Sequence, residues 1–524
     1  MRKLLAALLA ASAVGLLVVG LVAAATAAPS KSSASASRTS AAHAAANGTL
    51  SMALIGDPGK LDPQQTLLQL ARQVAEFNYD TLVHQLPGGK IVSGLATKWK
   101  VLSLTKVRFT LRSGVTCVDG AKMTATVVKR NLDYVADAKN NSPLLGLYVP
   151  ENSTTVANNQ KRTVTVTFPS ANPFPLQGLG SVHMICPKGL ANRNSLLNGA
   201  DGSGPYKLAK VSPGSRYTMQ LRKGSRWGPG GSTSAGMPAT VVLRVVSNES
   251  TAANLLLTGG LNIATVAGPD RARLEKAKLF KKVIVAAPGE IWFNENKGHP
   301  AANAAVRKGL VQALQLGQIG KVFTSGRGVP IKQLTLQTFT PCSGNSVKGN
   351  VPAHNLTAAR RALSSHPSLK LLYPTDAGAG FAPAMTLAQA QLSAAGASAT
   401  LNGTTTPNLQ ATLFGSGNWD VALVPLGVSA PTQLISFLSG ATPPNGVNFA
   451  GINNGTYGGQ VDAALKTTGA TSCRHWLNAE KAIFKQADLA PTMSLTIPTF
   501  AKGAKFGLGA DGISPTTLRL TKKK

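Results

Sequence analysis

The stretch VRFTLRSGVTCVDGAKMTATVVKRNLDYV, residues 107–135, passes from a strand pattern through a turn into a helix pattern. Apolar and polar side chains alternate over residues 107–111, which is the period of a half-buried β-strand. Over residues 123–135 apolar side chains recur every three or four positions, as on one face of an amphipathic helix. A strand followed this closely by a helix indicates a core of mixed α/β type.

The same change of pattern repeats along the chain. Further strands are predicted at residues 48–55, 162–168, 241–246, 369–373 and 420–424. Further helices are predicted at residues 66–83, 301–316, 357–364, 384–395 and 459–465. The chain has 524 residues, which is too many for one hydrophobic core, so we expect an α/β protein with two or three lobes.

The N-terminal residues indicate export from the cytoplasm. Arg2 and Lys3 precede a charge-free apolar run over residues 4–28, and the small residues at 25–27 suit a signal peptidase. We therefore expect a signal peptide at residues 1–27 and a Ser/Ala-rich linker at residues 28–47. The apolar run is long enough to cross a bilayer, so an uncleaved anchor is the alternative. Both interpretations predict an extracytoplasmic body, which is secreted, periplasmic or held at the cell surface.

The chain has four cysteines, Cys117, Cys186, Cys342 and Cys473. Because no cysteine precedes Cys117, a lipoprotein anchored through a cysteine after the signal sequence is excluded. An even, sparse set in an exported chain predicts two disulfides, for which three pairings are possible, and four buried thiols are the alternative. No close Cys/His spacing indicates a zinc site, and we predict neither a metal nor a cofactor.

The composition is strongly basic. Lys and Arg number 53 against 20 Asp and Glu, which gives a formal net charge of +33. The basic residues are spread along the chain without a nucleic-acid-binding motif, so we expect no specific binding of nucleic acid. A diffuse excess of this kind instead predicts nonspecific attraction to an anionic polymer of the cell envelope.

Motifs that would indicate an enzyme are absent. The sequence has no H-E-x-x-H, no G-x-x-x-x-G-K-[ST] and no G-x-S-x-G, and its seven histidines are scattered. One G-x-G-x-x-G match occurs at residues 507–512, but the following ISPTTLRLTKKK has no helix pattern, so we interpret it as a turn. We predict that the protein is not an enzyme, and that Trp227 and Trp419 are core residues.

Seven segments in order carry a resemblance to a known family. They are LDP at 61–63, YDTLV at 79–83 followed by GKIVSGLATKW at 89–99, FTLRSGV at 109–115 with DG at 119–120, GSGPY at 202–206, RWG at 226–228, FN at 293–294, and VR at 306–307 with AL at 313–314. In this order they resemble the extracellular solute-binding proteins of the dipeptide, oligopeptide and nickel class, which is family 5. Proteins of this family supply ligands to ATP-driven importers.

The resemblance implies a type II, periplasmic-binding-protein-like clamshell of two lobes with an additional small domain. Domain I would comprise residues 48–85, 200–290 and 497–524, domain II residues 86–199, and domain III residues 291–496. The ligand would bind between the lobes, where closure excludes water. With these domains, the pairings Cys117–Cys186 and Cys342–Cys473 each stay inside one lobe and leave the hinge free.

Three segments provide the predicted ligand-binding residues. A turn after the first strand is expected to face the ligand, residues 292–294 lie where the chain would enter domain III, and residues 427 and 429 lie in the family's ligand-anchoring segment. The alternatives are a plain turn for the first segment and a core aromatic for the second. The predicted residues are Asp57, Pro58, Gly59, Trp292, Phe293, Asn294, Gly427 and Ser429.

The anchoring segment departs from that of peptide-binding relatives. Those proteins hold the ligand's α-ammonium with an Asp, whereas residues 421–437 of this chain contain no Asp or Glu. A buried ammonium without an anionic partner is costly, so the preferred ligand is predicted to be neutral or anionic at that end. An acid from another segment, such as Asp57 or Glu295, could restore the anchor.

The sequence as a whole predicts a solute-binding protein that captures a small ligand, peptide-like or other, for the membrane permease of an ABC transporter. We expect it to act as a monomer. A cell-envelope adhesion or sensory module that uses the same fold is the alternative function.

Overall fold

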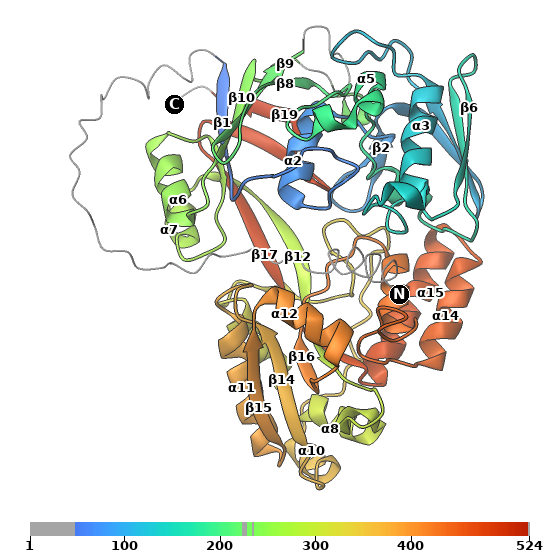
Figure 1. Ribbon diagram of the computed structural model, residues 1–524. Helices are drawn as coiled ribbons and strands as arrows, with labels where there is room; N and C mark the ends of the chain where they lie inside the picture. Colours follow the sequence, from blue (N-terminus) through green and yellow to red (C-terminus); the bar gives the residue numbers. More distant parts are fainter. Residues whose placement is uncertain (1–47, 223–227, 233–234, 522–524) are drawn as a thin grey trace. The chain divides into compact units, whose positions relative to one another are not determined.

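The computed structural model describes residues 48–222, 228–232 and 235–521. The predicted signal peptide, the linker and Trp227 lie outside these residues. The described chain forms two compact units. Unit 1 is Val285–Thr496, and unit 2 comprises residues 48–284 and 497–521. The chain passes between the units within two strands, β12 (Phe280–Phe293) and β17 (Leu489–Ala501) (Figure 1).

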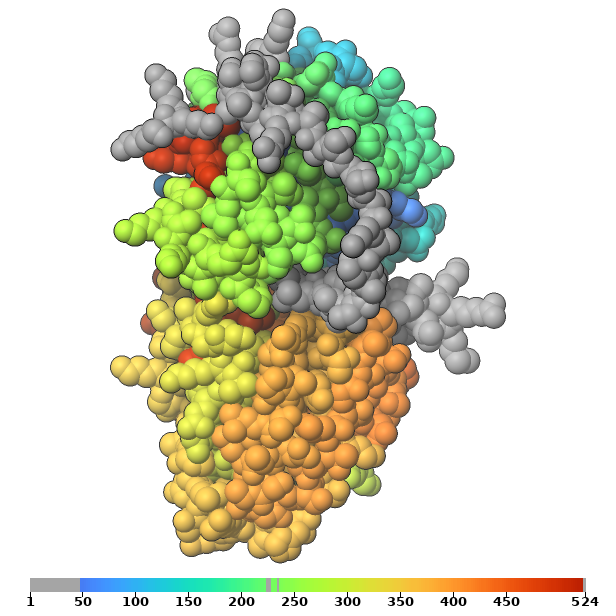
Figure 2. Space-filling model, turned by 90° about the vertical axis from the view of Figure 1, so that its left-hand side faces the viewer, coloured from blue at the N-terminus to red at the C-terminus, as the bar shows by residue number. Residues whose placement is uncertain are grey.

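Unit 2 is built around a mixed sheet. β1 (Thr49–Leu54) pairs in parallel with β10 (Thr240–Val245) and β11 (Ile263–Thr265), and β9 (Arg216–Leu221) and β8 (Tyr206–Ser212) continue the sheet antiparallel. The inward side chains of β1 alternate with outward ones, as the sequence predicts. Helix α2 (Gln69–Asn78) packs its apolar side against this core and against the hairpin of β18 (Ala504–Gly509) and β19 (Gly512–Leu520). The helices α6 (Glu249–Thr258) and α7 (Arg271–Lys276) form part of the light-green surface in Figure 2.

A second, smaller sheet of unit 2 contains the stretch with which the sequence analysis began. Its strands, in the order β4 (Ala96–Ser103), β5 (Lys106–Leu111), β7 (Thr163–Thr167) and β6 (Thr154–Asn158), are antiparallel. Helix α3 (Ala125–Ala136) covers one face, and the Thr124 side chain caps its start by accepting a hydrogen bond from the Val127 N–H. Nearby lie β2 (Val83–Gln85), β3 (Ile91–Ser93), α4 (Pro175–Leu179) and α5 (Pro187–Ala191). This region has its own apolar core.

Unit 1 has a three-layered arrangement around β14 (Ser368–Pro374), which pairs in parallel with β15 (Ser398–Thr404) and β16 (Val421–Leu423). β16 also pairs antiparallel with β12, and β13 (Val329–Pro330) pairs with β17. β16 is buried along its whole length and β14 is buried from Leu371 onward, which is typical of a sheet covered by helices on both faces. The helices are α8 (Ala304–Ala313), α9 (Leu316–Phe323), α10 (Leu356–Ala362), α11 (Phe381–Ala394), α12 (Thr406–Ala411), α13 (Ile435–Leu438), α14 (Gly455–Leu465) and α15 (Gly469–Lys485).

Both predicted disulfides are present, Cys117–Cys186 in unit 2 and Cys342–Cys473 in unit 1. Each therefore stays within one unit, as predicted. The division of the chain into three domains stays a prediction. Over the residues that the structure describes, no helix is both long and apolar enough to span a membrane.

Several predicted elements differ in extent from the observed ones. The helix predicted at 66–83 ends at Asn78, because Tyr79 is extended and Asp80 forms a bridge with Met184. The helix predicted at 301–316 is divided, since Asn303 caps the start of α8 and the chain turns again before α9. Helix α15 was missed because the polar residues Ser472 and Glu480 lie on its buried side and obscure the apolar period. The turn predicted at 507–512 is confirmed as the β18–β19 hairpin.

Candidate functional site

Three of the predicted ligand-binding residues lie at the end of β12 in unit 1. The Trp292 indole N–H donates a hydrogen bond to the Val424 carbonyl (2.9 Å), and its ring packs on Phe449 with centroids 4.8 Å apart. Phe293 is fully buried in the core of unit 1. The Asn294 side chain donates to the carbonyls of Gly417 and Trp419. Trp292 is thus beside the anchoring segment, whereas Phe293 and Asn294 hold the surrounding backbone in place.

The anchoring segment itself is tightly packed. A Cβ on Gly427 would lie 3.3 Å from the Cβ of Ala287, so a larger residue has little room there. The Ser429 N–H donates to the Gln433 side chain (3.0 Å), which also accepts from the N–H of Ala430. These contacts fix the backbone of residues 427–430 next to Trp292.

An acid that the sequence analysis did not select contacts this segment. Glu290 on β12 is fully buried and accepts a hydrogen bond from the Leu426 N–H through Oε2 (3.2 Å). Its Oε1 has no hydrogen-bond partner among the described residues. Burial raises the pKa of Glu290 well above its ordinary value, and the nearby Glu480 raises it further. A single acid within the uncharged, largely apolar run over residues 283–293 was the signal in the sequence that could have identified Glu290.

Aromatic rings surround Phe449 in the same part of unit 1. The Trp292 ring is joined there by Phe414, Trp419 and Phe437, with centroids 5.5, 5.9 and 6.5 Å from that of Phe449. Trp419 is fully buried, which confirms its interpretation as a core residue. Trp292, Phe437 and Phe449 are buried as well, so Phe414, which is partly exposed, is the ring of this group that can contact a ligand without rearrangement.

The predicted turn at residues 57–59 lies in unit 2. Asp57 accepts hydrogen bonds from the N–H of Gly59 (2.7 Å), the N–H of Gly214 and the Tyr217 hydroxyl (2.7 Å). Burial opposes ionisation of Asp57, but the Tyr217 hydroxyl and the two N–H groups outweigh it, so its pKa is lowered. The Asp57 carboxylate is therefore engaged within its own turn and with β9.

Glu295, the other acid considered as an anchor, forms an ion pair in unit 1. Its Oε2 lies 3.1 Å from Nη1 of Arg307, which also contacts Asp488. Burial raises the pKa of Glu295 to about 8, with a further contribution from the Asp488 carboxylate. Its role as an anchor stays a prediction, as do the roles of the eight predicted residues.

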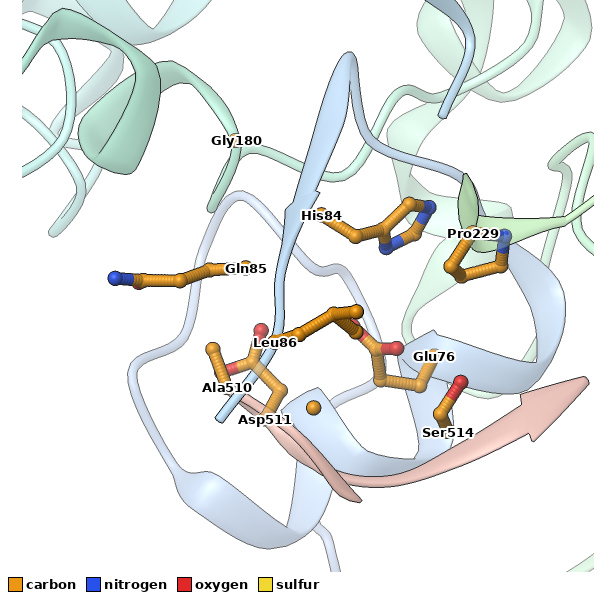
Figure 3. Close-up of a pocket in the computed structure, with 10 residues that line it drawn as sticks. Glu76, His84, Gln85, Leu86, Gly180, Pro229, Ala510, Asp511 and Ser514 are labelled. Carbon is orange, nitrogen blue, oxygen red and sulfur yellow. The ribbon is translucent and has the colours of Figure 1, made fainter. Parts of the chain in front are cut away.

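Unit 2 also contains a pocket that the sequence did not indicate (Figure 3). It is a small, open pocket of about 20 Å³, and its lining includes Glu76 from α2, His84 from β2 and Asp511 from the β18–β19 turn. In Figure 3 the carboxyl groups of Glu76 and Asp511 and the ring of His84 lie around the same space. Burial lowers the pKa of His84, which favours its neutral form.

A charged cluster lies beside this pocket. The Arg72 guanidinium donates two hydrogen bonds to the Asp511 carboxylate, both 2.7 Å long, and Arg72 is almost completely buried. His183, which is fully buried, places Nε2 3.2 Å from Oε1 of Glu76. Arg72 and Glu76 lie four positions apart on α2, but His183 and Asp511 are remote from them in the sequence, so no local motif could have revealed the cluster. We call Arg72, Glu76, His183 and Asp511 the α2 cluster.

Comparison with known proteins places the chain in a family. Residues 90–446 match the family model described as bacterial extracellular solute-binding proteins, family 5 Middle. The chain belongs to family 5. The family predicted from the sequence is confirmed, and because family 5 consists of solute-binding proteins, the prediction that the chain is not an enzyme is confirmed as well. Family 5 proteins are extracytoplasmic.

Relatives and solved structures agree with this assignment. The glutathione-binding protein GsiB of Salmonella paratyphi A is 27% identical over 286 residues, which is 52% of this chain and 52% of GsiB. The chain thus aligns with about half the length of the curated relatives it matches. A substrate-binding protein of Microbacterium hydrocarbonoxydans, solved with 4-hydroxybenzoate hydrazide, is 26% identical with a TM-score of 0.71, covering 90% of this chain and all of that one. The substrate-binding protein CtaP of Listeria monocytogenes has a TM-score of 0.77 at 17% identity, covering 91% and 100%. The predicted type II α/β fold is confirmed.

Proposed function

We propose that this family 5 protein captures a small ligand outside the cytoplasm and delivers it to the membrane permease of an ABC transporter. The observation that carries the proposal is the family match over residues 90–446, together with structural likeness to solved substrate-binding proteins over their whole length. The export signal predicted at residues 1–27 fits this location. A single chain suffices, because the chain itself contains both units.

The ligand is proposed to be neutral or anionic where peptide binders bind an ammonium group. Residues 421–437 contain no acid, and the carboxyl group that does contact the segment, Glu290, has a strongly raised pKa. A protonated Glu290 provides no negative charge for an ammonium but offers an O–H donor. The likeness to a protein solved with 4-hydroxybenzoate hydrazide supports an uncharged aromatic ligand, for which the partly exposed Phe414 ring is a suitable partner.

The test is a thermal-shift screen of the full chain against peptides, sugars, opines, metallophores and aromatic hydrazides, followed by calorimetry. A ligand at 100 times its Kd stabilises a protein by about 2.7 kcal/mol, which the screen readily detects. Peptides are then compared in their free and N-acetylated forms. Loss of a charge-assisted hydrogen bond costs roughly 1.5–3 kcal/mol, so a preference of tenfold or more for free amines would refute the proposed ligand class.

A second proposed interaction is attraction to anionic envelope polymer, and one surface favours it. In the small sheet, Val107, Phe109 and Val166 face the core beneath α3. The opposite face is exposed and carries Lys98 and Lys100 on β4 with Lys106 and Arg108 on β5, where Lys100 lies directly opposite Arg108. Four cations on one flat face concentrate a positive potential that suits a polymer bearing phosphate or carboxylate groups.

Binding to purified wall polymer should fall steeply as salt is raised, whereas ligand affinity should change little. The triple variant Lys98→Gln/Lys100→Gln/Lys106→Gln should bind the polymer more weakly. Its matched control, Lys276→Gln/Lys278→Gln/Lys282→Gln, removes the same charge from another exposed part of unit 2. Equal loss in both triples would assign the attraction to total charge rather than to the sheet face. N-terminal sequencing of the mature protein separates a free receptor from an anchored adhesion or sensory module.

A further inference from the structure

The α2 cluster brings together three side chains of the kinds that bind transition metals. Glu76, His183 and Asp511 each present one ligand atom, and these atoms all lie within 4.8 Å of one another. They come from helix α2, from the segment that follows α4, and from the turn between β18 and β19. One imidazole nitrogen with two carboxylate oxygens is a donor set that suits Zn²⁺ and related divalent ions.

The distances require little rearrangement. Zn²⁺ binds imidazole nitrogen and carboxylate oxygen at about 2.0–2.2 Å, so neighbouring ligand atoms in a tetrahedral site lie about 3.4 Å apart. The His183 Nε2 and Glu76 Oε1 atoms are already 3.2 Å apart. The Asp511 oxygen lies within 4.8 Å of both atoms, so Asp511 has to approach them by at most about 1.4 Å, together with the Arg72 guanidinium that it holds.

The charges of the cluster also favour a cation. The positive charge of Arg72 is balanced by Asp511, to which it donates two hydrogen bonds. The Glu76 carboxylate faces His183, and no Lys or Arg side chain of the described residues forms an ion pair with it. Each Asp511 oxygen has a second lone pair beyond the one that Arg72 uses, so Asp511 can bind a metal while it holds Arg72. A largely buried carboxylate is costly unless a cation compensates it.

His183 has a nitrogen available to an ion. It is fully buried, and its Nδ1 has no hydrogen-bond partner within the described part of the chain, so no neighbour of Nδ1 fixes which nitrogen carries the ring proton. With the proton on Nε2 the ring donates to the Glu76 carboxylate without a metal, and with the proton on Nδ1 the Nε2 lone pair is available to an ion. The adjoining pocket, lined by Glu76 and Asp511, gives water molecules access to complete the coordination.

We propose that Glu76, His183 and Asp511 bind one divalent transition-metal ion of the Zn²⁺ type. The ion joins α2, the segment around His183 and the C-terminal hairpin, and it thereby stabilises unit 2. This site is distinct from the ligand-anchoring segment of unit 1, so the proposal does not depend on the proposed transport function.

The test uses the full chain after chelator treatment, titrated with Zn²⁺ against a chromophoric chelator, and with Co²⁺ to record its ligand-field absorption. We expect one ion per chain and a rise in the melting temperature of unit 2. Glu76→Gln and His183→Asn should each weaken Zn²⁺ binding by at least tenfold and change the Co²⁺ spectrum. Glu76 is partly exposed, so Glu76→Gln keeps the test valid if His183→Asn fails to fold.

The matched control is a partly buried His/carboxylate contact in unit 1, between His299 Nδ1 and Asp420 Oδ1 at 2.8 Å. It belongs to no group of three possible ligands among the described residues, so His299→Asn should leave Zn²⁺ affinity unchanged. Absence of a stoichiometric ion in the wild-type protein would overturn the proposal. The proposal would also be overturned if Glu76→Gln binds Zn²⁺ as tightly as the wild type, or if His299→Asn weakens binding as much as Glu76→Gln does.

Discussion

Glu480→Gln is predicted to stabilise unit 1 at high pH and to have little effect at low pH. Glu480 lies on α15, is 4% exposed, and accepts hydrogen bonds from the Leu334 N–H and the Ser346 hydroxyl through the same oxygen. Burial raises its pKa from 4.5 to about 7, although these two hydrogen bonds act in the opposite direction. Gln presents a carbonyl oxygen that can accept both bonds, so the substitution removes the titration and keeps the contacts.

The sign follows from the folded and unfolded pKa values. Below pH 4.5 both states hold the proton, and Glu480 contributes no pH dependence. Between pH 4.5 and 7 the folded state holds a proton that the unfolded state has released, so the free energy of unfolding falls as pH rises, by up to about 1.4 kcal/mol per unit. Above pH 7 the loss is complete, and over 2.5 pKa units it reaches about 3 kcal/mol.

The assay is urea denaturation at intervals from pH 4.5 to 8.5, with a probe for unit 1 such as tryptophan fluorescence. The difference between variant and wild type removes the contribution of Glu295, and it includes the accompanying change at Glu290, whose pKa the Glu480 carboxylate helps to raise. Glu151→Gln on the exposed surface is the control and should leave the pH profile unchanged. A difference that does not grow between pH 5 and 7, or one that grows as pH falls, would refute the reasoning.

Three further perturbations test the packing. Serine in place of Cys342 and Cys473 should lower the stability of unit 1 by about 2–4 kcal/mol in denaturant titration, and non-reducing peptide mapping that found either cysteine joined elsewhere would contradict the observed pairing. Gly204→Ala places a Cβ 2.5 Å from a backbone carbon of Asn78, so we expect a loss of several kcal/mol in thermal unfolding, whereas Gly317→Ala, with open space around its Cβ, should be neutral or stabilising. Asn303→Ala removes the cap that accepts from two N–H groups of α8 and should cost about 1 kcal/mol; an unchanged melting temperature would show that the cap is dispensable.

The Gly204 contact gives a physical reason for one of the sequence motifs. Residues 202–206 read GSGPY, and a Cβ on either glycine would collide with the backbone of Asn78 at the end of α2. The motif therefore marks a place where two segments of unit 2 approach too closely for a side chain.

The sequence by itself determined the class of the protein, the α/β fold and most of its elements. A strand or helix with one buried side has a period of apolar residues in its sequence. This period predicted the strand at residues 107–111 and the helix at residues 123–135. The apolar period failed to predict α15, because the polar residues Ser472 and Glu480 lie on its buried side. Glu480 can be buried there because it accepts a hydrogen bond from the Ser346 hydroxyl. Chain length predicted two or three lobes, since one core cannot hold so many residues, and the described chain forms two units.

Only the tertiary structure decided which polar groups meet. Glu290 acquires its raised pKa from a site built by residues of β12, the anchoring segment and α15, and the Arg72–Asp511 pair joins residues 439 positions apart. The free energy of a charge depends on its distance to other charges and on its burial, and neither quantity has a period along the chain. The sequence could therefore show that Glu290 lies within a largely apolar run, but not which groups surround it. The partners of Glu290 and of Arg72 are defined only when segments remote in the sequence fold together.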